Sequence, residues 1–319
     1  GRPAGSPPAR LIQYGHGFFG SRASKSEIGH LHPLLDSGGF VYLACDWWGM
    51  SEQDSISVVE AITGHPSDTA LFTDRVHQAI ANFIVLAALA SGPLAELPEI
   101  QVDDQPLYDR RHIYFVGNSQ GHILGGTYLA LSPAIERAVL GVGGAGFSIM
   151  MSRAVPFAPF REFMAMYQPD PVEVNKILVL LQQSLERIDP ATYAPFVLEE
   201  ILPGGPSARH VLMHMGLNDT QVPNMATEFH ARALGIPLLE PSAAPVEGLA
   251  RKSYPADGSG LVVFDLGAEP PPQDARPAAG DNGVHSRVRE LPAAVRQIDA
   301  FLLPGGEIIQ TCDGSCDPE

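Results

Sequence analysis

Short apolar runs alternate along this 319-residue chain with longer segments that repeat apolar positions at helical spacing. This alternation is typical of a mostly parallel sheet whose strands are covered by helices. A strand that is buried on both faces reads as a continuous apolar run, and six short runs fit that description. The predicted strands are residues 11–14, 40–45, 112–117, 138–142, 210–215 and 261–266.

The segments between these runs predict the covering helices. Residues 69–91 are periodic enough for one long helix, and a second is expected to begin just after Ser119 and to run to Leu131, before Pro133. The last helix is expected over residues 287–303, where Pro304 and two glycines end it. The pattern therefore predicts the α/β class, with a mostly parallel sheet flanked by helices.

Residues 150–205 interrupt the alternation, because they separate two predicted strands by more than one crossover helix needs. The segment is rich in Phe, Met and Pro and has an amphipathic stretch at 172–187. Long insertions between core elements are often lids or binding segments, so we expect a helical cap; a purely structural excursion is the alternative. The expected organisation is a flexible lead-in (1–10), a core (11–149 and 206–304), the cap (150–205) and a tail (305–319), with an exposed loop at 270–283.

Composition narrows the possible partners. Hydrophobic residues make up 45% of the chain and charged residues 18%, which suits a globular protein, and the formal charge is −16. Such a charge repels phosphate backbones, so we expect no nucleic acid partner. No uninterrupted apolar run reaches the length of about 18 residues that a membrane helix needs, so no membrane span is expected. Nothing in the composition indicates the oligomeric state.

The three cysteines bear on the compartment. Cys45 ends an apolar run, whereas Cys312 and Cys316 lie in a polar tail. If the tail pair forms a disulfide, the protein belongs in an oxidising compartment, secreted or periplasmic; two reduced thiols are the alternative. Zinc usually takes four ligands and no histidine follows this pair, so we expect no metal and no cofactor.

The candidate nucleophile is Ser119, in the segment Gly117-Asn118-Ser119-Gln120-Gly121. A serine hydroxyl is a poor nucleophile unless it is exposed, close to a base and near groups that stabilise an oxyanion. A sharp turn from strand to helix supplies that geometry, since the glycines permit a strained backbone and the helix presents its first amides. The chain contains 32 glycines, so the bare pattern is common and its place between a predicted strand and a predicted helix carries the argument.

Donors for an oxyanion are predicted at two places. Acyl transfer needs two backbone N–H groups that point at the developing negative charge. One would be the amide of Gln120, directly after the candidate nucleophile. The other would come from the loop after the first predicted strand, where His16-Gly17 precedes two aromatic residues, and the best candidates are Phe18 and Gly17. A simple glycine-rich strand exit is the alternative for that loop.

An acid and a base are expected downstream. His285 follows the last predicted strand in a polar loop, and Asp219 follows the strand at 210–215. Both would lie at the carboxyl edge of the sheet, where active sites of open α/β sheets collect. The rival acids are Asp46, Asp265, which falls in a predicted strand, and Asp281, which is too close to His285 in sequence. A surface histidine in a loop is the alternative for His285.

The order Ser, Asp, His, each after a different strand, resembles the α/β-hydrolase superfamily, and the likeness extends from Leu11 to Leu303. Residues 46–51, Asp-Trp-Trp-Gly-Met-Ser, are similar to the D-x-x-G-x-S turn of that family, and residues 108–113 are esterase-like. Members normally have two strands and a hairpin before the His-Gly loop. Only about ten residues precede it here, so either those strands lie outside this chain or the sheet is shortened.

The resemblance implies a serine hydrolase that cleaves a small-molecule or lipid-like carboxylic ester through an acyl-enzyme on Ser119. The same triad serves peptidases, lactonases, polyester depolymerases and acyltransferases, and a non-catalytic binding module of this fold is an alternative from another class. A dehalogenase or epoxide hydrolase of this fold would have Asp at the position of Ser119, so the serine disfavours both classes. The candidates for an apolar substrate pocket are Phe19, Trp47, Trp48, Phe147, Phe157, Phe160 and Met164.

Overall fold

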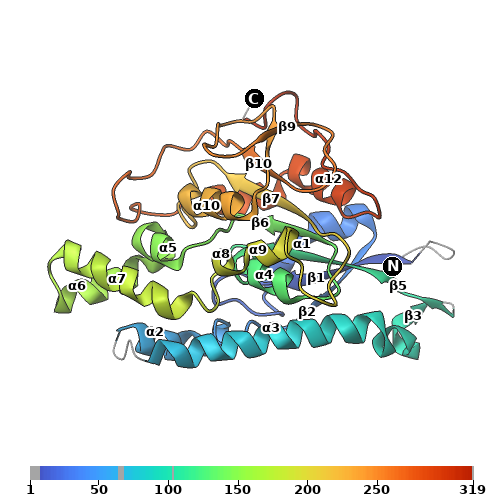
Figure 1. The fold of residues 1–319 in the computed structure, drawn as a ribbon, viewed down its shortest axis with the longest axis horizontal. Helices are drawn as coiled ribbons and strands as arrows, with labels where there is room; N and C mark the ends of the chain where they lie inside the picture. Colours follow the sequence, from blue (N-terminus) through green and yellow to red (C-terminus); the bar gives the residue numbers. More distant parts are fainter. Residues whose placement is uncertain (1–7, 64–67, 103, 318–319) are drawn as a thin grey trace.

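A computed structural model describes residues 8–63, 68–102 and 104–317. Eight strands form one sheet in the order β2-β1-β5-β6-β7-β10-β8-β9, and within the described ranges all neighbouring strands in it run parallel (Figure 1). This confirms the predicted fold class. The strands are β1 (Ala9–Gly15), β2 (Phe40–Ala44), β5 (Tyr108–Asn118), β6 (Arg137–Gly141), β7 (His210–Gly216), β8 (Leu238–Glu240), β9 (Arg251–Ser253) and β10 (Gly260–Phe264), with a separate hairpin of β3 (Gln101–Val102) and β4 (Gln105–Pro106).

All six predicted strands are present, and the differences have local causes. β5 begins four residues before the predicted start, because Asp109, Arg110 and Arg111 extend the strand on an exposed, polar stretch. β8 and β9 were not predicted, since each has only three residues and β9 is fully exposed. Residues 1–7 of the expected lead-in lie outside the described ranges, and β1 already begins at the buried Ala9.

Helices cover both faces of the sheet (Figure 1). α1, α11 and α12 pack together on one face, whereas α3, α4, α8, α9 and α10 lie on the other. The α-helices are α1 (Lys25–Gly38), α2 (Ser55–Thr63), α3 (Thr69–Ser91), α4 (Gln120–Leu131), α5 (Phe147–Arg153), α6 (Ala158–Tyr167), α7 (Pro171–Leu185), α8 (Pro190–Tyr193), α9 (Pro195–Leu198), α10 (Asn224–Leu234), α11 (Val284–Glu290) and α12 (Pro292–Phe301). Single 3₁₀ turns occur at η1 (Glu52–Asp54), η3 (Pro93–Glu96), η4 (Pro98–Ile100) and η5 (Val155–Phe157).

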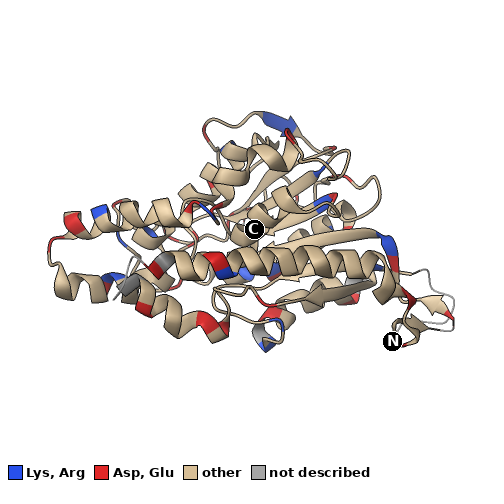
Figure 2. Ribbon diagram, turned by 60° about the horizontal axis from the view of Figure 1, so that its bottom comes forward, with Lys and Arg blue, Asp and Glu red and all other residues tan. Residues whose placement is uncertain are grey.

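The two long helices predicted from periodicity are confirmed as α3 and α4. The stretch Ala70–Glu96, which includes most of α3, is long and apolar enough to cross a membrane by length and composition alone. Val76, Ala79, Ile80 and Phe83 bury its inner face in the core of the α/β unit, and no charged residue occurs between Arg75 and Glu96 (Figure 2). A core helix can have the same length and composition, but the outer face of this one is also apolar over its second half, where Val85 and Leu89 are exposed.

The expectation of a single last helix at 287–303 is wrong, because the chain forms α11 and α12 with a break at Leu291. Leu291 has φ −59° and ψ 126°, an extended conformation that the following Pro292 imposes by steric clash. Since α11 begins at Val284, His285 lies in the first turn of a helix and is buried, whereas a loop position was expected.

The cap expected over residues 150–205 corresponds to α5 to α9 between β6 and β7, residues 147–198, which we call the inserted segment; it divides into three parts. α5 and η5 adjoin the carboxyl edge of the sheet, α6 and α7 project beyond the sheet at the left of Figure 1, and α8 and α9 return to pack against α4. The amphipathic stretch expected at 172–187 is α7, and its buried positions recur at helical spacing: Val174, Leu178, Leu181 and Leu185.

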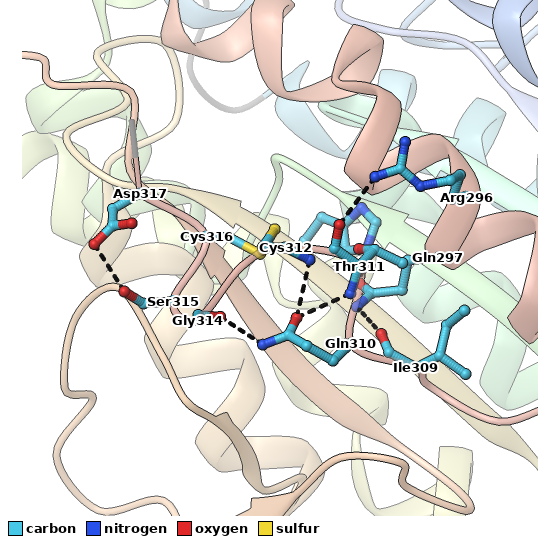
Figure 3. The surroundings of a disulfide bond; sticks show 11 residues. Arg296, Gln297, Ile309, Gln310, Thr311, Cys312, Gly314, Ser315, Cys316 and Asp317 are labelled. Carbon is cyan, nitrogen blue, oxygen red and sulfur yellow. Dashed lines mark hydrogen bonds between the residues drawn. A yellow bond between two sulfur atoms is a disulfide. The ribbon is translucent and has the colours of Figure 1, made fainter. Parts of the chain in front are cut away.

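The tail is fastened at the carboxyl end of β10. Cys312 and Cys316 form a disulfide, and the backbone N–H of Asp265 donates to the carbonyl of Cys316 at 2.7 Å. Figure 3 shows the tail beside α12, where Arg296 donates to the Thr311 carbonyl and Gln297 to the Ile309 carbonyl. The tail therefore braces the end of the strand that precedes the loop leading to His285.

Candidate active site

Ser119 occupies a strained turn between β5 and α4. Its backbone has φ 57° and ψ −123°, a conformation that costs a non-glycine residue on the order of 1–3 kcal/mol. Three hydrogen bonds hold it there: the Ser119 N–H donates to the Gly141 carbonyl at 2.9 Å, and the Ser119 carbonyl accepts from His122 N and Ile123 N. The turn presents the serine side chain at the carboxyl edge of the sheet.

The two glycines of the motif are required by close packing. A Cβ atom on Gly121 would lie 2.0 Å from the carbonyl oxygen of Gly15, and one on Gly117 would lie 2.2 Å from the carbonyl oxygen of Gly121. Both distances are far below van der Waals contact. The spacing of glycine, serine and glycine thus follows from how tightly α4 approaches β1 and β5.

Asp219 and His285 form a buried pair at the same edge. His285 Nδ1 lies 2.7 Å from Asp219 Oδ2, and the two residues are only 1% and 2% exposed. A carboxylate only accepts, so Nδ1 carries the proton and Nε2 keeps a free lone pair. The other carboxylate oxygen accepts from the backbone N–H groups of Gln221 and Val222.

The structure thus brings Asp219 and His285 together, and it places Ser119 after the strand next but one to β7 in the sheet. His285 Nε2 is buried and has no hydrogen-bond partner within the described ranges, Ser119 Oγ included. Contacts between a catalytic base and its nucleophile are often long in the absence of substrate and tighten in the substrate complex. The free Nε2 is the atom that such a contact would use.

The loop that carries Asp219 and the loop that precedes His285 are bound to each other. Asn282 donates from its side chain to the Asn218 carbonyl at 2.7 Å, and Gln221 donates to the Asp281 carboxylate at 2.8 Å. Asn218 has φ 65°, a left-handed conformation that Asn tolerates well. These bonds fix the position of Asp219 relative to His285.

The rival acids have other partners. Asp46 forms an ion pair with Arg22 and also accepts from its backbone N–H, whereas Asp265 accepts from the Gly267 N–H. Asp281 binds Gln221 and the Gly283 N–H. Asp219 is therefore the carboxylate that contacts His285 in the described part of the chain.

The loop after β1 is held by a buried histidine. The Trp47 N–H donates to His16 Nε2 at 2.9 Å, so Nδ1 carries the proton and donates to the Gly17 carbonyl at 2.9 Å. Burial lowers the pKa of His16, which keeps this neutral form. The backbone N–H groups of Phe18 and Gln120 donate to no other described atom, so both are free for an oxyanion.

The turn at residues 46–51 packs beside the turn that carries Ser119. Asp54 accepts from Gly49 N, Ser51 N and Ser51 Oγ, and a Cβ on Gly49 would lie 2.4 Å from the Phe72 carbonyl. The turn places the Met50 carbonyl 2.9 Å from the Gln120 side-chain amide. A hydrogen bond thereby links Met50 to Gln120, the residue after Ser119.

A small cavity of about 30 Å³ lies beside Ser119 and Gln120. The loop after β1, the turn at residues 46–51, α4, α5, η5 and the loop after β7 border it, and no bordering residue is charged. Besides Ser119 and Gln120, the bordering residues are Phe18, Met50, Ile123, Phe147, Met150, Pro156, Phe157, Gln221 and Val222. Phe18 from the β1 loop and Phe157 from η5 face each other with ring centroids 5.2 Å apart.

Two of the seven residues expected in the pocket, Phe147 and Phe157, border this cavity. Trp47 instead belongs to the core, where it stacks on Phe83 with centroids 3.8 Å apart. Trp48 points outward with 47% of its surface exposed. Phe19 packs on Phe18 and Phe160 on Phe157, both outside the cavity lining, and Met164 is buried within the insertion.

Sequence reasoning missed one buried carboxylate, Asp189. It accepts hydrogen bonds from the backbone N–H groups of Gly146, Phe147 and Ala191 and from the Gln182 side chain, all at 2.9–3.1 Å. Asp189 therefore fixes the start of α5, which carries two cavity residues. The only sequence signal was Asp-Pro at the start of a helix, which also fits an ordinary N-cap.

No protein-family model matches the sequence, and no curated protein sequence matches it either. Among solved structures, the 2,6-dihydroxy-pseudo-oxynicotine hydrolase is similar with a TM-score of 0.51 and 15% identity, over 97% of this chain and 65% of that one. The acetyl xylan esterase 1 of Thermoanaerobacterium sp. gives 0.48 and 17% over 88% and 73%. An acylaminoacyl peptidase of Pyrococcus horikoshii gives 0.44 and 15% over 81% and 32%.

The chain spans about two thirds of the first of these hydrolases and about a third of the peptidase. The parallel sheet with helices on both faces, the strained elbow after β5 and the similarity over nearly the whole chain define its class. The chain has the α/β-hydrolase fold.

Proposed function

We propose that the protein is a serine hydrolase that cleaves carboxylic esters, with Ser119, His285 and Asp219 as its catalytic triad. The observation that carries this proposal is the buried hydrogen bond between Asp219 and His285, which leaves His285 Nε2 as a free base at the edge where Ser119 sits in its strained turn.

In this mechanism His285 Nε2 takes the proton from Ser119 Oγ as the oxygen attacks the ester carbonyl carbon. The carbonyl oxygen becomes an oxyanion that the amides of Gln120 and of Phe18 or Gly17 stabilise. His285 then gives its proton to the departing alkoxide, which leaves as the alcohol. Water then gives a proton to the same imidazole and its oxygen attacks the acyl carbon; the bond from that carbon to Ser119 Oγ breaks, the acid leaves, and the imidazolium returns the proton to Ser119 Oγ. Asp219 holds the imidazole and stabilises its charged form.

The chemistry of the cavity supports a neutral, apolar acyl group. No charged residue borders the cavity, and most of its walls are aromatic or aliphatic side chains. A charged acyl group there would lose its hydration without a partner, which is costly. A small-molecule ester is therefore the favoured substrate. The Cys312–Cys316 disulfide is compatible with an extracellular or periplasmic location.

The test is hydrolysis of p-nitrophenyl acetate and butyrate by wild type and by Ser119→Ala. We expect kcat/KM to fall by about 10⁴-fold or more, because no other group can form the acyl-enzyme. Ser286→Ala is the matched control, since Ser286 is half-buried on α11 beside His285 and lies outside the cavity. The control is expected to stay within about twofold of wild type. Wild-type rates in Ser119→Ala would refute the assignment.

A further inference from the structure

This inference rests on the proposed function. It concerns which part of the ester, the acyl chain or the leaving group, occupies the cavity beside Ser119. A tetrahedral intermediate on Ser119 Oγ has its oxyanion at the Gln120 amide and two further substituents, the acyl chain and the leaving group. The leaving group must receive its proton from His285. Neither His285 nor Asp219 borders the cavity, whereas Ser119 and Gln120 do. The acyl chain is therefore the substituent that enters it.

The cavity is small. Roughly 10–15 Å³ of such space holds one water molecule, so about 30 Å³ accommodates about two or three. A methyl or methylene group is close to a water molecule in size. The space beyond the carbonyl carbon thus suits about one to three carbons, which corresponds to acetyl, propionyl and butyryl groups.

The walls that limit this length are well supported. Phe147 and Met150 on α5 are 3% and 2% exposed, and Asp189 fixes the helix that carries them. Phe157 closes the cavity against Phe18 and is itself backed by Phe160, with centroids 5.8 Å apart. A longer chain would have to displace packed side chains, which costs as much as overpacking a core.

We propose that this protein is selective for short, unbranched acyl chains of two to four carbons, and that Met150 and Phe157 set the limit. Both residues border the cavity from the inserted segment, Met150 on α5 and Phe157 on η5. Their side chains decide which acyl groups fit and take no part in proton transfer.

The experiment is a series of p-nitrophenyl esters from acetate to dodecanoate, with kcat/KM measured for each. In wild type we expect the value to fall about tenfold or more between butyrate and octanoate. In Met150→Ala and in Phe157→Ala the octanoate-to-butyrate ratio should rise about tenfold, because the missing side chain leaves room for further methylenes. Met164→Ala is the matched control, since Met164 is buried in the same insertion but does not border the cavity; its ratio should equal that of wild type.

A second measurement needs only the wild-type protein and so does not depend on variants that fold. Ethyl p-nitrophenyl alkylphosphonates with methyl, butyl and octyl chains place the alkyl group where the acyl chain lies, and inactivation should be fastest for methyl and slowest for octyl. Hydrolysis or inactivation that is as fast with octyl as with short chains overturns the length limit and leaves the proposed hydrolase standing. Absence of both reactions at every chain length overturns the proposed function, and the length limit with it.

Discussion

Two regions of the molecule meet at the cavity beside Ser119, and different interactions hold them. Hydrogen bonds fix the carboxyl edge of the sheet. Asp219 binds His285, and the Asn282 side chain donates to the Asn218 carbonyl. The backbone N–H of Ser119 donates to the Gly141 carbonyl. Here backbone geometry and hydrogen bonds determine where the side chains of the proposed triad lie.

The inserted segment contributes a different kind of wall. Phe147, Met150 and Phe157 meet the cavity through apolar contact, and the polar anchor of α5 is Asp189. We therefore expect a substitution at the sheet edge to change the rate of the reaction itself. A substitution in the insertion should change stability or the choice of acyl chain.

Asp219→Asn tests the polar edge most severely. An Asn amide can donate to His285 Nδ1, which favours the tautomer with the proton on Nε2 and removes the base, so we expect kcat to fall about 10⁴-fold with an intact fold. Asp265→Asn is the control, because Asp265 is a rival acid whose side chain accepts from the Gly267 N–H and does not contact His285. Steady-state kinetics with p-nitrophenyl butyrate and a circular dichroism spectrum suffice. Equal losses in the two variants would argue against a specific role for Asp219.

Acid should lower the free energy of unfolding through buried histidines that lie outside the inserted segment. Burial lowers the pKa of His214 and of His230 to about 4, whereas an unfolded histidine has a pKa of about 6.5. The unfolded chain therefore binds more protons between these values, and stability that is present above pH 6.5 is lost as the pH falls towards 4. Residues 147–198 contain no histidine, so the effect arises outside the insertion.

Urea unfolding from pH 7.5 to pH 4.5 measures this loss. His214 Nε2 lies 2.8 Å from Gln297 Oε1, and His214→Gln should make the free energy of unfolding less dependent on pH by up to about 1.4 kcal/mol per pH unit. His32→Gln changes an exposed histidine and should leave the slope as in wild type. An unchanged slope in His214→Gln would show that this imidazole does not contribute.

Asp189→Asn probes the polar anchor of the insertion. The amide has one accepting oxygen and no charge, so the variant should lose about 1.5–3 kcal/mol of unfolding free energy in urea at pH 7.5. Asp170→Asn is the control: Asp170 is an exposed N-cap of α7 with one bond, to Val172 N, and Asn caps nearly as well. A loss no larger than that of Asp170→Asn would mean that apolar packing alone positions α5.

The sheet and the elbow could be predicted from the sequence because their signals are local. Buried parallel strands read as apolar runs, and Gly117 and Gly121 are demanded by backbone contacts that lie within one motif and its neighbouring strand. The pairing of Asp219 with His285 followed from both being placed after strands, since the carboxyl ends of parallel strands share one edge.

The walls of the cavity could not be predicted in the same way. Trp47 and Phe157 are both aromatic and both follow short elements, yet Trp47 stacks in the core and Phe157 borders the cavity. That difference depends on the path of the insertion across the site, which no local pattern encodes. Asp189 was missed because the backbone N–H groups that it fixes at the start of α5, those of Gly146 and Phe147, lie far from it in sequence. Pro292 is a sequence signal for the break at Leu291, but residues 287–303 were predicted as one continuous helix.

Labelling by a fluorophosphonate probe tests the central claim most directly. The folded wild-type protein is treated with the probe, digested, and the modified peptide is located by mass spectrometry, with Ser119→Ala and heat-denatured protein as controls. The account predicts a single adduct on Ser119 that forms in the folded wild type and in neither control, since only the folded chain brings this hydroxyl to the sheet edge that also carries His285 and the proposed oxyanion donors. Folded protein without an adduct on Ser119, or with an adduct on another residue, would contradict it.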